Sequence, residues 1–182
     1  VRGAMVAFDL LTLLLIAALL RRLGQDPARA ILYAWSPLVA WEVGNGGHLE
    51  AAMLPLLVGA VLAFHRGWLR TAGLLVGAAA SMKLYPILAL GALGKRRLGL
   101  VAAPALGVVA AGYLAYAGAG AKILGFLPRY VGSAEDHNIG LRRLLEWGMG
   151  GLGLANPREL AFGICLLLLA ILGTRLWRRD EP

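Results

Sequence analysis

The sequence predicts an all-α fold: a polytopic transmembrane helical bundle with a short broken hairpin and one long outward loop. Hydrophobic residues make up 59% of the chain and charged residues 15%, whereas soluble domains have about 45–50% and about 25%. The apolar residues gather in runs that approach the roughly 20 residues a helix needs to cross a bilayer. Barrel-type alternation of apolar and polar residues is absent from the sequence, so helices are the expected spanning structure.

Turn-forming residues separate the first three expected helices within a single transmembrane domain, residues 1–182. A helix over about residues 4–23 carries one acid, Asp9, and ends before Gly24. The turn at Gln25-Asp26-Pro27 starts a second helix over about 28–41, with proline in its first turn. The glycines between residues 44 and 47 disfavour a continuous helix, so the third helix is expected over about 48–65.

The segment 71–94 is expected to form a hairpin broken at residues 83–86. Pro86 disfavours helix at the preceding Tyr85 and removes a backbone donor, and basic residues flank the segment on both sides. With the hairpin, 11 basic residues lie on the inner side and 6 on the outer side, against 10 and 7 for a single crossing. Both arrangements follow the positive-inside rule, and the hairpin follows it better.

The C-terminal part combines two further helices with the most polar stretch of the chain. A fifth helix is expected over about 98–116, followed by an outward loop over 117–157, and loops this long are usually functional or disordered. Within the loop, Leu141–Trp147 has the pattern of a short amphipathic helix at the membrane interface. Asn156-Pro157 supplies an N-cap and a first-turn proline for the last helix, about 158–177.

Charge and cysteine content exclude several classes of function. The net charge is +8, but the basic residues cluster at the ends of apolar runs, as in membrane anchors, so we expect no nucleic-acid partner. The single Cys165 excludes an intramolecular disulfide. No spacing in the sequence matches a zinc site, a nucleophilic triad or a phosphate-binding glycine loop, so we expect no cofactor. Because the chain begins at Val1, we expect it to be a fragment of a larger protein.

The turn between residues 42 and 50 is the first candidate site. Glu42, Asn45, His48 and Glu50 place two acids, an amide and an imidazole within nine residues. Ionisable groups near membrane depth are costly and normally face a cavity. The intervening glycines allow backbone amides to approach an anion, and the start of the next helix favours negative charge. The alternative is a solvated turn whose polar groups cap the helices.

Other polar residues lie at membrane depth or in the loop. Lys83, next to the expected break, could meet a phosphate, pair with an acid, or extend to the interface. Asp9 could support a packing contact or pair with Lys83. The loop carries a mixed cluster that is solvated in the simpler interpretation: Tyr130, Glu135, Asp136, His137, Asn138, Arg142 and Arg143.

Two stretches resemble a known family. Ser36-Pro37-Leu38, then Glu42 and Gly46-Gly47-His48-Leu49-Glu50, resemble the "N-P-L … E … G-H-x-D" turn of bacterial GT-C glycosyltransferases, and the polyprenyl-phosphate-mannose-dependent mannosyltransferases are closest in pattern. The run from Gly73 and Gly77 to Lys83-Leu84-Tyr85-Pro86 resembles their "G-x-x-x-G … K-x-x-P" segment. More loosely, Arg129-Tyr130 to Asn138 is similar to their outward loop. Ser36 replaces the usual Asn, Glu50 replaces Asp, and no Trp precedes Asn138 at the usual spacing.

The resemblance implies an integral inner-membrane enzyme, multi-pass, with its active side outward. It would transfer a hexose, with mannose as the first candidate, from a polyprenyl-phosphate donor to a glycan or glycolipid acceptor. Glu50 or Glu42 would be the catalytic base, although the family's acid normally lies in an upstream outward loop, which we expect to be absent from this sequence. The remaining residues would bind substrate: Asn45, His48, Lys83, Tyr85, Arg129, Tyr130, Asn138 and Arg142. The alternatives are a transporter or flippase fragment with a midplane site at the broken helices, or a membrane scaffold without chemistry.

Overall fold

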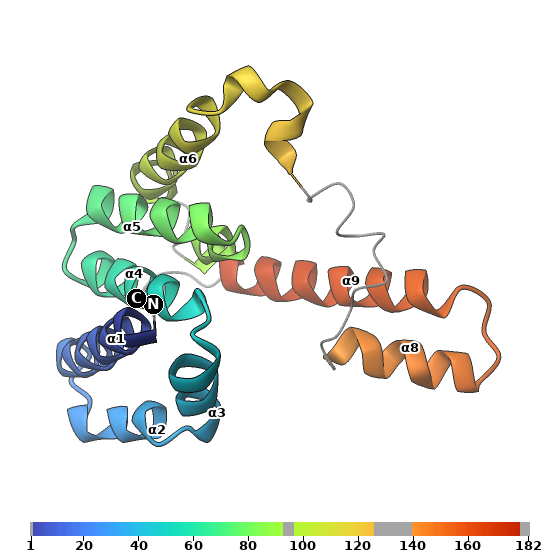
Figure 1. The fold of residues 1–182 in the computed structure, drawn as a ribbon, viewed down its shortest axis with the longest axis horizontal. Helices are drawn as coiled ribbons and strands as arrows, with labels where there is room; N and C mark the ends of the chain where they lie inside the picture. Colours follow the sequence, from blue (N-terminus) through green and yellow to red (C-terminus); the bar gives the residue numbers. More distant parts are fainter. Residues whose placement is uncertain (1, 93–96, 126–139, 179–182) are drawn as a thin grey trace. The chain divides into compact units, whose positions relative to one another are not determined.

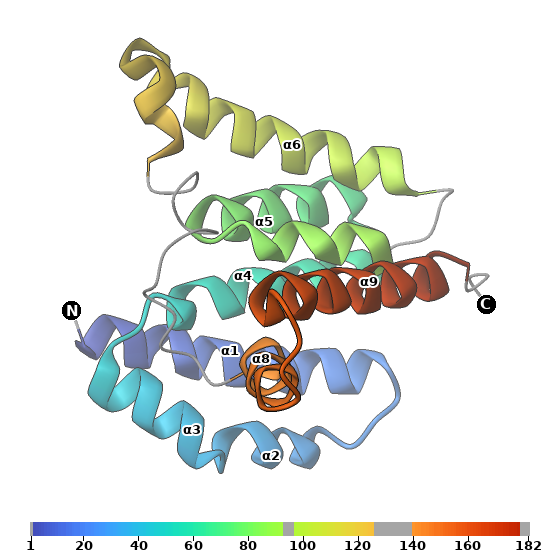
Figure 2. The same ribbon diagram turned by 90° about the vertical axis from the view of Figure 1, so that its right-hand side faces the viewer.

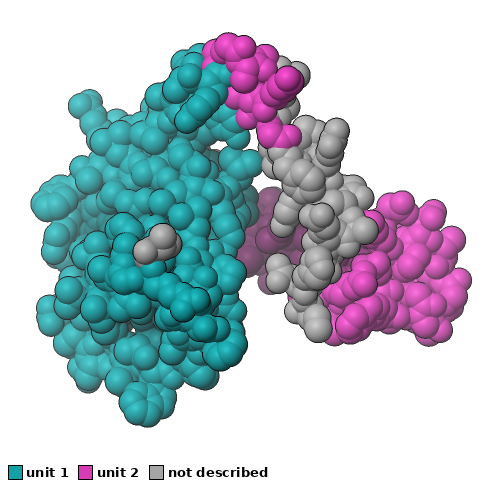
Figure 3. All heavy atoms as spheres, viewed as in Figure 1, with its two compact units in different colours: residues 1–116 teal, residues 117–182 magenta. Residues whose placement is uncertain are grey.

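The computed structural model describes residues 2–92, 97–125 and 140–178, and it divides into two compact units. The first unit is Val1–Tyr116 and the second is Ala117–Pro182 (Figure 3). Within the described residues every regular element is helical, which agrees with the all-α expectation.

The first unit consists of a series of helices of unequal length and type. The three η elements depart from α geometry: η1 and η3 are 3₁₀-helices and η2 is a π-helix. In chain order the elements are α1 (Arg2–Arg22), η1 (Pro27–Ala30), α2 (Ile31–Ala34), α3 (Pro37–Val39), η2 (Ala40–Gly46), α4 (Glu50–His65), α5 (Leu69–Met82), η3 (Tyr85–Ala92) and α6 (Leu98–Leu114).

Four helices of this unit pack in succession. Figure 1 shows α1, α4, α5 and α6 as successive layers, and each packs against the next. The short elements η1 and η2 pack against α1, so the segment joining α1 to α4 lies along the outer side of this row. This arrangement brings the start of α4 close to the end of α5, because α4 and α5 are antiparallel neighbours (Figure 2).

The chain reverses direction where α5 ends. α5 stops at Met82, and Lys83 is extended with φ −146° and ψ 137°. The 3₁₀-helix η3 then packs back along α5, so that Leu90 joins Ala72 and Val76 in one buried cluster. Residues on both sides of Lys83 can meet in this way only if the segment folds as a hairpin. The two ends of the hairpin therefore lie on the same side of the unit; their side of a membrane stays a prediction.

The second expected helix differs from the structure. In place of one helix over 28–41, the chain forms η1 and α2, breaks at Trp35-Ser36, and continues through α3 into η2. Ser36 is extended with ψ 115°, because the residue before a proline is pushed out of the helical region. The expected break within residues 44–47 was placed too early: the π-helix includes Gly44 and Gly46 and ends only at Gly47, whose φ is +62°.

Small side chains make up the core of the first unit. The central cluster contains four alanines and two valines besides Leu90: Ala60, Ala63, Ala72, Ala105, Val76 and Val101. Large apolar side chains lie on the outside instead; Leu14 is 67% exposed and Leu106 55%. Small interior residues with close helix approach are typical of helices that pack within lipid, and large exposed apolar surfaces mark interaction with membranes or other partners.

Two glycines set the distance between α5 and α6. A Cβ added at Gly77 would lie 2.5 Å from the carbonyl oxygen of Ala105 and 2.8 Å from Cβ of Val108, and one at Gly73 would collide with the carbonyl oxygen of Val101. The G-x-x-x-G spacing places both glycines on one face of α5. Close backbone approach at small-xxx-small motifs is a common way for helices to associate in membranes.

The second unit contains a helical hairpin. Its described elements are η4 (Ala117–Leu124), α8 (Leu141–Gly151) and α9 (Pro157–Arg178), and α8 packs against α9. The long segment 117–157 is therefore partly helical. Pro157 is the first residue of α9, as expected, whereas Asn156 has φ +54° and not the extended backbone usual at an N-cap.

Within the part of the chain that the structure describes, two helices, α1 and α9, are long and apolar enough to cross a membrane; the qualifying stretches are Arg2–Arg22 and Pro157–Arg175. The helices α4, α5 and α6 are apolar but shorter, between 14 and 17 residues. The structure thus supports association with a membrane through two helices by length and composition. The multi-pass arrangement stays a prediction.

Candidate functional site

A tight turn between η2 and α4 brings His48 back toward Glu42. The π-helix closes at Gly47, whose amide donates to the carbonyl oxygen of Glu42. The amide of His48 also donates to that oxygen, at 3.3 Å. Gly47 adopts a left-handed φ of +62°, which a residue without a Cβ reaches at no steric cost. The turn therefore reverses the chain so that the side chains of residues 42 and 48 lie together.

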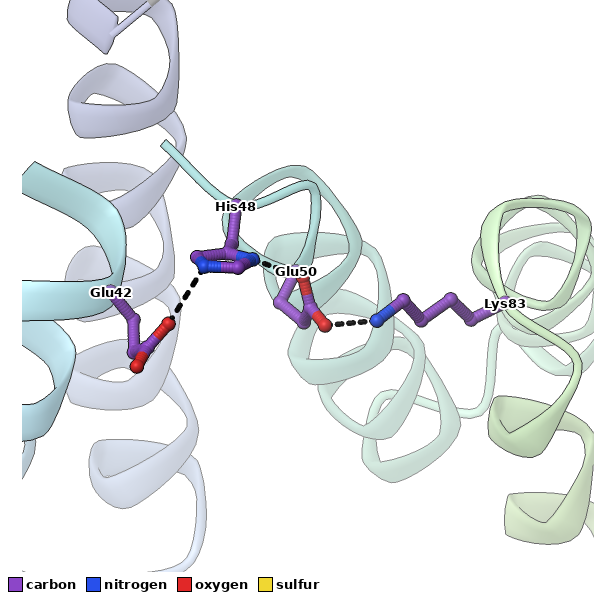
Figure 4. Close-up of polar contacts among 4 residues, drawn as sticks. All are labelled: Glu42, His48, Glu50 and Lys83. Atoms are coloured by element: carbon purple, nitrogen blue, oxygen red, sulfur yellow. Dashed lines mark hydrogen bonds and ion pairs between the residues drawn. The ribbon is translucent and has the colours of Figure 1, made fainter. Parts of the chain in front are cut away.

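Four charged or ionisable side chains form a line across this turn (Figure 4). Nε2 of His48 lies 3.0 Å from Oε2 of Glu42, and Nδ1 of His48 lies 4.0 Å from Oε2 of Glu50. Oε1 of Glu50 in turn accepts a hydrogen bond from Nζ of Lys83. The side chains are between 37% and 55% exposed, so the line is open to a ligand. We call Glu42, His48, Glu50 and Lys83 the acid–imidazole cluster.

Each member of the cluster comes from a different local feature. Glu42 lies in η2, His48 in the turn, and Glu50 is the first residue of α4. Lys83 extends from the point where α5 ends, and Figure 4 shows its side chain reaching across to Glu50. The side chain of Lys83, which follows the end of α5, thus connects the break in the α5–η3 hairpin to the start of α4.

The remaining expected site residues fall into three groups. Asn45 lies in η2 and Tyr85 begins η3; both are exposed and belong to the same unit as the cluster. Arg142 belongs to the second unit, in α8, where its Nη1 lies 3.8 Å from Oε2 of Glu146. The other three, Arg129, Tyr130 and Asn138, lie outside the described residues.

A second polar contact joins α1 to α2. The hydroxyl of Tyr33 donates to Oδ1 of Asp9 at 2.5 Å, and the fully buried Thr12 donates its hydroxyl to the carbonyl oxygen of Phe8. The expected pair between Asp9 and Lys83 is not what the structure shows. Asp9 accepts a hydrogen bond from Tyr33, and Lys83 donates one to Glu50. Asp9 stood out in the sequence as an acid in an apolar run, but its partner depends on how α2 packs and has no local signal.

Tyr33→Phe is expected to destabilise the first unit by about 1–3 kcal/mol, because a half-buried carboxylate loses its hydrogen-bond donor. The measurement is the free energy of unfolding of the purified protein in detergent. Tyr116→Phe is the matched control, since Tyr116 is 71% exposed. Equal stability of the two variants would mean that water replaces the Tyr33 hydroxyl without cost.

Among the residues that the structure describes, no group of three or more His, Cys, Asp or Glu side chains is arranged to hold a metal ion. The groups of the cluster have acid–base chemistry of their own. Carboxylates and an imidazole can accept a proton from a hydroxyl group, and an ammonium can stabilise negative charge on a phosphate.

Comparison with protein families identifies the relationship of this chain. Residues 1–103 match the model of the MptA_B family, described as Alpha-(1->6)-mannopyranosyltransferase, N-terminal domain. The chain belongs to this mannosyltransferase family. The match includes every member of the acid–imidazole cluster. No curated protein and no solved structure matches the chain.

The family supports part of what the sequence resemblance implied. Membership in this family indicates a glycosyltransferase that transfers mannose. It also implies a sugar donor and a glycan acceptor in general. The carrier lipid, the GT-C relationship and the outward orientation stay predictions. The roles of the site residues likewise remain predictions, although the contacts within the acid–imidazole cluster are known from the structure.

Proposed function

We propose that this mannosyltransferase domain transfers mannose from a polyprenyl-phosphate carrier to a glycan or glycolipid acceptor at the outer face of the inner membrane. The observation that carries the proposal is the acid–imidazole cluster, which lies wholly within the region that matches the family. The cluster combines proton acceptors with a cation, and sugar transfer from a phosphate carrier requires both.

In this proposal the two carboxylates promote loss of the proton from the acceptor hydroxyl. Glu50 and Glu42 are the candidates for catalysis, and Asn45 and His48 contact sugar hydroxyls. Lys83 attends the phosphate and Tyr85 contacts the substrate, while Arg129, Tyr130, Asn138 and Arg142 stay predictions from the sequence. An ammonium group has three donors, so the ion pair with Glu50 is compatible with a phosphate oxygen on Lys83.

A membrane location is supported by two features of the described residues. The candidate spans α1 and α9 have the length and composition to cross a bilayer. The first unit also buries alanine, glycine and valine while exposing leucine, the distribution expected when lipid and not water surrounds the helices. A donor carried on a long-chain lipid would reach such an enzyme by diffusing within the leaflet. We take the polar turn between η2 and α4 to face outward.

The test compares donors in membranes that contain the full-length protein. Labelled mannose is supplied on a polyprenyl phosphate or on a nucleotide, and labelled glycan or glycolipid product is measured. Transfer is expected from the lipid-linked donor, and Glu50→Ala and Lys83→Ala are each expected to reduce it by about 100-fold or more. Glu159→Gln, at an exposed position in the second unit, serves as the control and should transfer normally.

Two outcomes would contradict the proposal. Transfer from the nucleotide donor alone would remove the lipid carrier. Undiminished transfer by both alanine variants would remove the cluster from the site. Movement of the lipid-linked sugar across sealed vesicles, without product, would instead indicate the transporter or flippase alternative.

A further inference from the structure

The contact between Glu42 and His48 determines which nitrogen of the imidazole is basic. An ionised carboxylate carries no proton and attracts positive charge, so the nitrogen that lies 3.0 Å from Glu42 is the one whose proton is favoured. In a neutral imidazole the other nitrogen then has a free lone pair. The ion-pair contact with Glu42 thus favours the Nε2–H tautomer of His48 and leaves Nδ1 as its proton acceptor.

The turn holds this ring in one position. A Cβ added at Gly46 would lie 2.5 Å from Cδ2 and 2.9 Å from Nε2 of His48, so the imidazole packs directly on the glycine backbone. Glu42 holds the same segment through its carbonyl oxygen, which accepts from the amides of Gly47 and His48. Main-chain and side-chain contacts therefore fix both the place and the tautomer of the ring, as a positioned proton acceptor requires.

The charged group nearest to Nδ1 among those described, Glu50, does not form a hydrogen bond with it. Oε2 of Glu50 is 4.0 Å away, too far for a hydrogen bond, and the other oxygen of Glu50 pairs with Lys83. On the neighbouring α1, the stem of Arg2 comes within 3.6 Å of a Cβ position at Gly47. The side chain of His48 is 55% exposed, so a hydroxyl can approach Nδ1. Once protonated, the ring would lie between two carboxylates, which stabilise its positive charge.

We propose that His48 is the group that takes the proton of the acceptor hydroxyl and that Glu42 is its positioning residue. This inference rests on the proposed function and moves the proton acceptor within it from the carboxylates to His48, which Glu42 positions and Glu50 stabilises. The acceptor oxygen forms a bond to the anomeric carbon of mannose while its proton passes to Nδ1. The bond between that carbon and the phosphate oxygen breaks, and the electron pair leaves with the phosphate of the lipid carrier. Glu50 stabilises the imidazolium and links it to Lys83.

The first experiment measures the pH dependence of kcat for mannosyl transfer from the lipid-linked donor by the full-length protein in membranes. His48→Gln is expected to lower kcat by about 100-fold or more and to remove the acid limb of the profile, where protonation of the imidazole stops the reaction. Glu42→Gln keeps the imidazole but removes the carboxylate that positions it, so the acid limb is expected to remain while kcat falls about tenfold.

A matched pair of glycine variants tests the positioning of the ring without removing any polar group. Gly46→Ala places a methyl group against the imidazole and is expected to lower kcat about tenfold or more. Gly44→Ala lies in the same π-helix, where an added Cβ meets nothing within 4 Å, and should keep wild-type kcat. Because both are single-methyl changes at exposed positions of the same π-helix, the comparison stands even where His48→Gln folds poorly.

The outcomes separate this inference from the proposed function. If the wild-type protein transfers lipid-linked mannose but His48→Gln keeps its rate and pH profile, the assignment to His48 is wrong and the proposed function stands. Equal rates for Gly46→Ala and Gly44→Ala would also overturn it. If the wild-type protein transfers no mannose from the lipid carrier, the proposed function fails, and this inference falls with it.

Discussion

Exchanging the charges of Glu50 and Lys83, in the double variant Glu50→Lys/Lys83→Glu, is expected to keep the fold and to reduce mannosyl transfer by about 100-fold or more. The exchange preserves one acid and one base at the two positions, so an ion pair between the start of α4 and the end of α5 can still form. It places a cation beside Nδ1 of His48 and an anion where Lys83 would attend the phosphate. The rate of mannosyl transfer should therefore fall, whereas the ion pair between α4 and α5 should be kept.

The stability of the exchanged protein should be close to that of the wild type. Both side chains are substantially exposed, 42% for Lys83 and 37% for Glu50, and exposed ion pairs contribute about 0.2–1 kcal/mol. The free energy of unfolding in detergent and the rate of transfer from lipid-linked mannose are measured together. A purely structural pair would show the opposite result: transfer restored by the exchange relative to each single variant.

The control for the exchange also changes one acid and one base. Arg70→Gln/Glu159→Gln alters exposed residues outside the acid–imidazole cluster and leaves the net charge unchanged, as the exchange does. Wild-type transfer by this control would show that the slower transfer of the exchange variant depends on which charge stands at positions 50 and 83. It would exclude a general effect of changing one acid and one base on the surface.

Gly77→Ala is expected to destabilise the first unit by about 1–3 kcal/mol, because the added methyl group meets the backbone of α6. The nearest atoms are the carbonyl oxygen and Cα of Ala105, at 2.5 and 2.9 Å, and neither can move without shifting the helix. The measurement is again the free energy of unfolding in detergent. Since Lys83 follows directly after α5, a shift of this helix should also weaken transfer.

Gly107→Ala is the matched control for this prediction. Gly107 lies inside α6, where an added Cβ meets nothing within 4 Å. Alanine is the better helix former by about 1 kcal/mol, so this variant should be as stable as the wild type or more so. Equal effects of the two substitutions would mean that α5 and α6 do not approach as closely as the glycines indicate.

The sequence predicted those features of the fold that depend on local chemistry. Pro86 indicated the end of α5 before Lys83, and the apolar runs indicated most helices to within a few residues. Pro37 carried an equally local signal for the break at Ser36, yet one continuous helix was expected there. The π-helix through Gly44 and Gly46 was also missed, because its five-residue hydrogen-bond pattern has no distinctive sequence signature and glycine-rich segments usually interrupt helices.

The candidate site was foreseen in its residues and only partly in its contacts. A helix start was expected to direct His48 and Glu50 toward one place, and they lie 4.0 Å apart. The contact between Glu42 and His48 depends on the length of the π-helix and the positive φ of Gly47, which no spacing rule supplies. Long-range partners, such as Tyr33 for Asp9, depend on packing between helices far apart in the sequence.

The short central helices have a consequence for the surrounding lipid. At 1.5 Å per residue, α4 and α6, with 16 and 17 residues, are about 24–26 Å long, less than the hydrocarbon thickness of about 30 Å. In the membrane location proposed above, the bilayer must compress next to α4 and α6 to match their length. Such hydrophobic mismatch would draw lipid headgroups inward toward the ends of these helices. A long-chain carrier could then present its phosphate near Lys83 while its tail remains in the leaflet.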